Sequence, residues 1–236
     1  MPFEAPPVNP SPNGLYAATQ WAEIGEGQPS RHLNGVEVKG PNYGGESAFG
    51  VWDADWCTPP QLGGPRTEGE RPDILPPSES VTVWSYDECD LTGPSRAEVQ
   101  QRAAQIFRLQ EQTAVEREVA NRLLLDAGTP ETRPTLKEAV AYLEGELAKT
   151  NTLGFIHAGA DQVAREAGLF IASGTARKSP LGHTRVLGGG YVEGLGDTLV
   201  ATSQPFGWRD QMQLRTAMDE RHNIFAAIAE RSVLIG

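Results

Sequence analysis

The strongest hint of chemistry in this sequence is a glycine-rich run at residues 188–196. Glycine-rich loops cradle phosphates when they follow a strand and open a helix, in the pattern Gly-x-Gly-x-x-Gly. Glu193 stands where the third glycine would be needed after Gly188 and Gly190, and no strong helix signal follows the run. The pattern therefore predicts a hairpin or loop between strands, and no bound cofactor.

The histidines and cysteines show neither a metal-binding nor a nucleophile pattern. His157 lies in an apolar stretch, which favours a hydrogen-bonded core residue over a metal ligand. Cys89 sits between Glu88 and Asp90, whose charges disfavour its thiolate. Both cysteines are predicted to be free thiols of a protein made in a reducing cytosol. The four histidines and two cysteines do not stand in His-x-x-x-His or Cys-x-x-Cys spacing. They are His32, His157, His183, His222, Cys57 and Cys89.

Two acidic clusters could attract a divalent cation, the pair Asp53 and Asp55 and the triplet Asp87, Glu88 and Asp90. In an acidic, Gly-rich region such groups are more often solvated loop charges. The sequence therefore predicts no catalytic, cofactor-binding or metal-ligating residue, and favours a protein that is not an enzyme. The alternative is a soluble enzyme with an acidic N-terminal domain, since catalytic residues can lie far apart in sequence.

The charge of the chain is uneven. Its 236 residues carry a net charge of −11, and residues 1–94 hold 14 acidic and 4 basic side chains against 17 and 16 in the remainder. No part resembles a polyanion-binding face, so sequence-specific nucleic-acid binding is not expected. No apolar run is long enough for a transmembrane helix, and the first residues lack the pattern of a signal peptide. We therefore expect no membrane association.

The first 94 residues contain 12 glycines and 14 prolines and show no helical periodicity. They also hold four of the five tryptophans, whereas disordered segments are poor in aromatic residues. Such an extended region can build little core of its own. Its large side chains must therefore be buried either against the second half of the chain or against a neighbouring subunit, where tryptophan is a favoured anchor. These candidates for inter-subunit contacts are Trp52, Trp56, Trp21 and Trp84.

The second half opens with a helix signal at residues 95–127. Ser95 and Glu98 form a capping-box pattern, no Gly or Pro interrupts the segment, and Gly128 is suited to end it. A helix of this length spans about 50 Å, which suggests an elongated subunit. The apolar stripe weakens at residues 110–113, so two shorter helices are the alternative. The predicted stripe is Val99, Ala103, Ile106, Val115, Val119 and Leu123.

The remaining elements predict an α+β fold with a mainly antiparallel sheet. A second capping box, Thr135 with Glu138, starts a helix that ends near Lys149 or Thr150. A short strand at 155–157 and a short helix at 161–167 come next. The later period-two segments predict strands at 184–187, 199–202, 212–216 and 224–235.

Three stretches of the second half form distinct motifs. They are Leu-Gly-Phe-Ile-His-Ala at 153–158, Ser-Pro-Leu-Gly-His at 179–183 followed by Gly-Gly-Tyr at 189–191, and the tail at 223–234 with its Ala-Glu-Arg triplet. These motifs resemble those of tailed-bacteriophage major capsid proteins with the Hong Kong 97-type fold. The resemblance is closest to capsid proteins of actinobacteriophages, and it covers residues 85–236 well but residues 1–84 in layout only.

The resemblance implies a division of the chain into four parts, and no scaffolding segment of its own is evident. They are an N-terminal arm at 1–34, an extended loop region at 35–94, a peripheral domain at 95–130 and 223–236 with the spine helix and the return strand, and an axial domain at 131–222.

The resemblance also implies a structural function. Copies would form hexamers and pentamers that close an icosahedral shell around packaged double-stranded DNA, without sequence-specific binding. Scaffolding, portal and decoration proteins are possible partners, the location is the virion, and synthesis takes place in the host bacterial cytoplasm. Trp52 and Trp56 are expected to anchor the loop on a neighbouring copy. The alternatives are an encapsulin-like nanocompartment shell, a tail or connector component, and the soluble enzyme named above.

Overall fold

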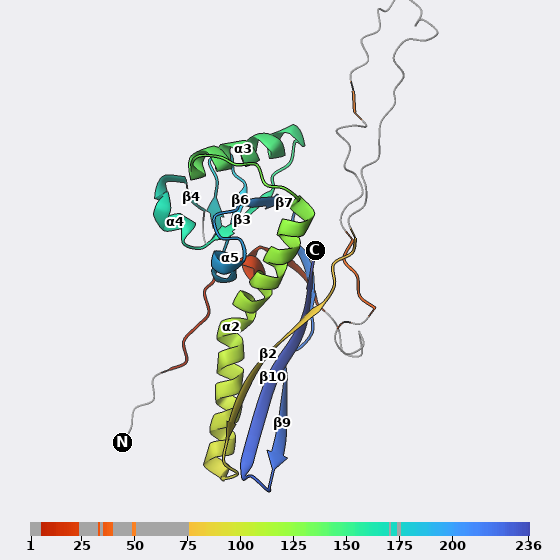
Figure 1. Cartoon of the computed structure of the whole chain (residues 1–236), viewed down its shortest axis with the longest axis vertical. Coiled ribbons are helices and arrows are strands. Elements are labelled where there is room, and N and C mark those ends of the chain that lie inside the picture. Colours follow the sequence, from red (N-terminus) through yellow and green to blue (C-terminus); the bar gives the residue numbers. More distant parts are fainter. Residues whose placement is uncertain are drawn as a thin grey trace, which may run out of the picture.

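A single helix, α2 (Gly93–Ala127), forms the long axis of the described structure (Figure 1). This computed structural model describes residues 6–23, 33, 35–39, 49–50, 76–169, 171–173 and 176–236. Thr92 precedes the helix in an extended conformation, and Gly128, with a φ of 69°, ends it as predicted. The helix continues without a break through residues 110–113, so the alternative of two helices is wrong. The predicted capping box is wrong as well, because Ser95 lies inside the helix and the N-cap is Thr92.

The buried face of α2 explains why its apolar stripe weakens. Two carboxylates, Glu111 and Glu116, lie on the buried face of the helix among the apolar residues. Ile106, predicted to be buried, is 38% exposed, and its neighbour Phe107 packs inward instead. The buried residues of the helix are Val99, Ala103, Phe107, Glu111, Val115, Glu116 and Ala120.

One sheet lies along α2 (Figure 1). Its strand order is β1-β8-β10-β2, and β9 pairs with the edge of β10 opposite β2. The pair β1 and β8 is parallel, and the others are antiparallel. Ile224–Ile235 therefore forms the central strand, and its length matches the strand predicted at residues 224–235. The strands are β1 (Gln20–Glu23), β2 (Val81–Cys89), β8 (Phe206–Arg209), β9 (Gln213–Asp219) and β10 (Ile224–Ile235).

A second sheet of order β4-β5-β6-β3-β7 and three helices make a smaller unit beside the C-terminal end of α2 (Figure 1). Thr135 accepts a hydrogen bond from the backbone N–H of Glu138 at 3.3 Å, which confirms the second predicted helix start. The elements are α3 (Leu136–Lys149), β3 (Phe155–Gly159), α4 (Gln162–Arg165), a 3-10 turn (Ala167–Leu169), β4 (Ile171–Ser173), β5 (Ala176–Lys178), β6 (Thr184–Gly188), α5 (Gly189–Gly194) and β7 (Val200–Thr202). The α+β class and the mainly antiparallel sheets are thus confirmed.

The glycine-rich run corrects one prediction, because it forms helix α5 rather than a hairpin or loop. A Cβ atom on Gly190 would lie 2.2 Å from the backbone oxygen of Thr113, and one on Gly194 would lie 2.6 Å from Cβ of Ala120. Glycine is therefore required for α5 to lie this close to α2. Tertiary packing outweighs the low helix propensity of glycine here.

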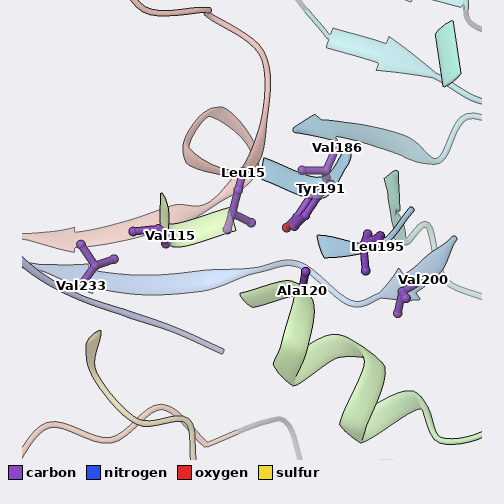
Figure 2. Packing of buried hydrophobic residues seen from close by; sticks show 8 residues of the cluster. All are labelled: Leu15, Val115, Ala120, Val186, Tyr191, Leu195, Val200 and Val233. Carbon is purple, nitrogen blue, oxygen red and sulfur yellow. The ribbon is translucent and has the colours of Figure 1, made fainter. Parts of the chain in front are cut away.

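The principal core joins the two sheets, α2 and residues 6–19, which we call the N-terminal segment (Figure 2). Helix α1 (Leu15–Ala18) inserts Leu15 into it, so residues near the N-terminus are part of the core. A smaller core at the other end of α2 joins Val99 and Ala103 to Phe225 and Ala227 of β10. The members of the principal core are Leu15, Val115, Ala120, Val186, Tyr191, Leu195, Val200 and Val233.

Candidate inter-subunit surface

Two buried carboxylates of α2 hold the N-terminal segment in place. Glu116 is fully buried, and its two oxygens accept backbone N–H groups from Leu15 and Gly190, each at 2.9 Å. Burial raises the pKa of the Glu116 carboxyl, although the bonded N–H groups oppose the shift. One side chain thus joins the N-terminal segment, α2 and α5.

The second carboxylate, Glu111, accepts the hydroxyl of Tyr16 at 2.9 Å and Nη1 of Arg231 at 2.9 and 3.0 Å. Desolvation is the largest cause that raises the pKa of Tyr16, and the charge of Glu111 adds to it. The site therefore ties α1, α2 and β10 together through charge-assisted hydrogen bonds.

Two glutamine side chains of α2 also bind the backbone of the N-terminal segment. Gln105 donates to the carbonyl of Val8 at 2.8 Å, and Gln112 donates to the carbonyl of Asn13 at 2.7 Å. Since main-chain carbonyls are bound, much of this recognition does not depend on which side chains the segment carries. The segment follows α2 in the same direction as the helix runs.

Trp21 packs largely within its own chain. Its indole N–H donates to the carbonyl of Tyr16 at 3.0 Å, the two rings meet edge to face with centroids 5.0 Å apart, and the guanidinium of Arg209 lies 4.9 Å from the indole centroid. The side chain is half-buried beside the principal core. As an inter-subunit contact, Trp21 stays a prediction.

Trp84 lies on the face of the first sheet that points away from α2. Ser85, the next residue in β2, is buried and donates to the carbonyl of Ala103 at 2.7 Å, so it faces the helix. Because successive strand residues point to opposite faces, Trp84 and Tyr86 point outward. They are 68% and 43% exposed.

The outward side chains of three adjacent strands form one surface, which we call the outer sheet face. Tyr86 lies directly opposite Ile228, which in turn lies opposite Arg215. Trp84 lies opposite Glu230, and Glu230 forms an ion pair with Arg215 at 2.7 Å. An exposed tryptophan, tyrosine and isoleucine side by side, bordered by an ion pair, are typical of an interface anchor with a polar rim.

A groove runs between the N-terminal segment, α2 and the turn between β8 and β9. Its volume is about 1110 Å³. Four arginines and one glutamate line it together with prolines, Phe107 and Met212, so we call it the Arg groove. The charged lining residues are Arg102, Arg108, Arg209, Arg231 and Glu111.

Sequence reasoning missed the Arg groove and the role of Tyr86. A period-two strand drawn through residues 81–86 would have placed Tyr86 on the face of Trp84. No local pattern reveals the groove, because its arginines come from separate elements. Trp52 and Trp56, predicted as the main anchors, and Cys57 lie outside the described residues. Cys89 is exposed at the end of β2.

His157 is a buried, hydrogen-bonded core residue, as predicted. Its ring nitrogens lie 3.0 Å from the hydroxyl of Tyr191 and 2.9 Å from the hydroxyl of Thr202. Burial lowers the pKa of His157 to about 3. Within the described residues, no three His, Cys, Asp or Glu side chains are grouped so that they could hold a metal ion.

This histidine should make the protein sensitive to acid. An unfolded histidine has a pKa of about 6.5, so the unfolded chain binds more protons than the folded chain between pH 6.5 and about 3. The free energy of unfolding should therefore fall as the pH drops through this window, by about 2–3 kcal/mol at pH 4.5 from this group alone. Urea unfolding of the wild type and of His157→Asn at pH 7 and 4.5 measures this. An equal loss in both proteins would contradict the assignment.

Among the described helices, none has the length and apolar character to span a bilayer.

No protein-family profile and no curated protein sequence matches the chain. Similar solved structures include a chain of Microbacterium phage Oxtober96, with 10% identity, coverage of 100% of this chain and 87% of that chain, and a TM-score of 0.45. A chain of Mycobacterium phage Che8 has 14% identity, 72% coverage of both chains and a TM-score of 0.42. A chain of the bacteriophage PhiM1 mature capsid has 10% identity, 100% and 88% coverage and a TM-score of 0.42.

Proposed function

We propose that this chain is the repeating shell subunit of a tailed bacteriophage, a major capsid protein of the Hong Kong 97 type, with a structural rather than an enzymatic role. The observation that carries the proposal is the outer sheet face, which exposes Trp84, Tyr86 and Ile228 along an elongated body. An exposed aromatic surface of this kind suits lateral contact between copies. The motifs at 153–158, 179–191 and 223–234 support the same conclusion.

In this proposal the four parts of the chain have different tasks. Residues 1–34 form the arm, residues 35–94 include the loop that lies on a neighbour, residues 95–130 and 223–236 form the peripheral domain, and residues 131–222 form the axial domain. Because β2 pairs with β10 over nine residues, residues 81–89 belong with the peripheral sheet rather than with the free part of the loop.

The proposed partners are many copies of the same chain, with scaffolding, portal and decoration proteins as possible further partners. The proposed location is the virion, after synthesis in the host cytoplasm. The shell would enclose double-stranded DNA without reading its sequence, because the chain as a whole is acidic, with a net charge of −11.

The cargo of purified particles tests this function. Particles from infected cells or from co-expression with the neighbouring genes are treated with nuclease, and the protected nucleic acid is measured. The proposal predicts protected double-stranded DNA inside closed shells. Shells that contain only protein would instead support a nanocompartment.

Replacing Trp84 with Ala should reduce shell assembly by about tenfold or more, since a tryptophan at an interface hot spot contributes about 2 kcal/mol or more and about 1.4 kcal/mol is a factor of ten. Thermal unfolding of the unassembled chain should change little, because the side chain is 68% exposed. Sedimentation measures the yield of shells, and Trp84→Phe, which retains an aromatic ring, is the matched control. Unchanged assembly of Trp84→Ala would remove the outer sheet face from the proposed contacts.

A further inference from the structure

The Arg groove holds positive charge that its own surroundings neutralise only in part. Arg231 is paired with Glu111, and Arg102 with Asp87 at 3.1 Å. Arg108 donates to the neutral side chain of Asn9, and Arg209 lies over the ring of Trp21. Neither Arg108 nor Arg209 has a carboxylate within ion-pair distance in the part of the chain that the structure describes. Two guanidinium groups are thus available for carboxylates.

The same groove also offers apolar surface. Phe107, Met212 and Tyr16 line it between the arginines, and three prolines of the N-terminal segment form one wall. A ligand with carboxylates alone would leave this surface uncovered, and an apolar ligand would leave the guanidinium groups without partners. The lining therefore fits a ligand that carries anionic and aromatic groups close together.

One segment of the chain has this composition. Residues 52–56 read Trp-Asp-Ala-Asp-Trp, with two indoles and two carboxylates within five positions. Carboxylates form strong, directional pairs with guanidinium groups, and indole rings pack well on arginine and apolar surfaces. The acidic first half, which holds 14 acidic and 4 basic side chains up to residue 94, also complements a groove rich in arginine.

We propose that residues 52–56 of a second copy dock in the Arg groove, with Asp53 and Asp55 paired to Arg108 and Arg209. This inference rests on the proposed function, which supplies the second copy and requires contacts repeated around the shell. It assigns a receptor to the two tryptophans that the sequence marks as anchors.

A charge-swap experiment on the full chain tests this proposal. The groove variant is Arg108→Glu with Arg209→Glu, and the segment variant is Asp53→Arg with Asp55→Arg. Each variant alone should lose shell assembly by about tenfold or more, because like charges would then meet or charges would lose their partners. An equimolar mixture of the two should restore rings of six subunits, in which the two chains can alternate so that each groove receives a matching segment from its neighbour. A ring of five cannot alternate, so closed shells should return only in a chain that carries all four changes.

Several outcomes would overturn the inference. If the chain with all four changes forms shells but the mixture forms no rings of six, the segment fills the groove of its own chain. Normal shells from the groove variant would remove the groove as a docking site, and normal shells with less DNA would identify phosphate as its ligand. Failure of the wild type to form shells would contradict the proposed function itself, before any variant is compared.

Two further variants guard against simple misfolding. Arg108→Gln with Arg209→Gln removes the charges without adding carboxylates near Trp21, and it should lower assembly while thermal unfolding stays close to wild type. Trp52→Ala with Trp56→Ala should lower assembly in the same way. If both of these double variants assemble as the wild type does, the segment does not bind in the groove.

Discussion

Replacing Glu116 with Ala should lower the free energy of unfolding by about 4 kcal/mol, because two buried N–H donors lose their acceptor at about 1–3 kcal/mol each. The donors are the backbone N–H groups of Leu15 and Gly190, both 2.9 Å from the carboxylate. Because one donor lies in the N-terminal segment and the other in α5, the loss of the carboxylate would loosen both parts together. Urea unfolding of the unassembled chain measures the change.

Glu118 provides the matched control, since it lies two residues further along α2 and is exposed. Glu118→Ala should change the stability by less than about 0.5 kcal/mol. Glu116→Gln should fall between the two, because one amide oxygen can accept only part of what the carboxylate accepts and the NH₂ group faces a donor. Equal stability of Glu116→Ala and Glu118→Ala would show that the carboxylate does not hold these segments.

Gly190→Ala should destabilise the chain by about 3 kcal/mol or more, since the added methyl group would overpack a tight contact between two helices. Its Cβ would lie 2.2 Å from the backbone oxygen of Thr113 and 2.7 Å from Cβ of Glu116, and a backbone atom cannot rotate away. If α5 moved away from α2 to make room for the methyl group, the hydrogen bond from Gly190 to Glu116 would also be strained. Thermal and urea unfolding measure the loss.

The neighbouring glycine is the control for this prediction. At Gly189 a Cβ would lie 3.7 Å from Oγ1 of Thr113, an ordinary contact. Gly189→Ala should therefore be neutral or slightly stabilising, by up to about 1 kcal/mol, because alanine has the higher helix propensity. If the two variants behave alike, the close approach of α5 to α2 is not what requires glycine at 190.

Elements with strong local signals could be predicted from the sequence. The helix at 136–149 has its Thr135–Glu138 start, and the strand at 224–235 has a long apolar run, so local patterns were sufficient. Helix α5 could not be predicted, because its glycines serve a contact with α2, in which Gly190 and Glu116 lie 74 residues apart in the sequence. The burial of Glu111 and Glu116, which interrupt the apolar stripe of α2, could not be predicted either. Their hydrogen-bond partners are distant in the sequence, so no local pattern reveals them.

The candidate surface was predictable only in part. The tryptophans were recognised as anchors by residue type, but the sequence could not show that Trp84 is exposed whereas Trp21 packs on its own chain. That distinction depends on which face of each strand α2 covers. The Arg groove was not predictable, because it needs Arg108, Arg209 and the N-terminal segment to meet in space.

Electron microscopy decides whether this chain is a shell subunit, with the protein expressed alone and beside its neighbouring genes and the products sized by sedimentation. We expect closed icosahedral shells, or rings of five and six subunits, under at least one of these conditions. Small discrete oligomers or monomers under both conditions would show that the chain does not build a shell.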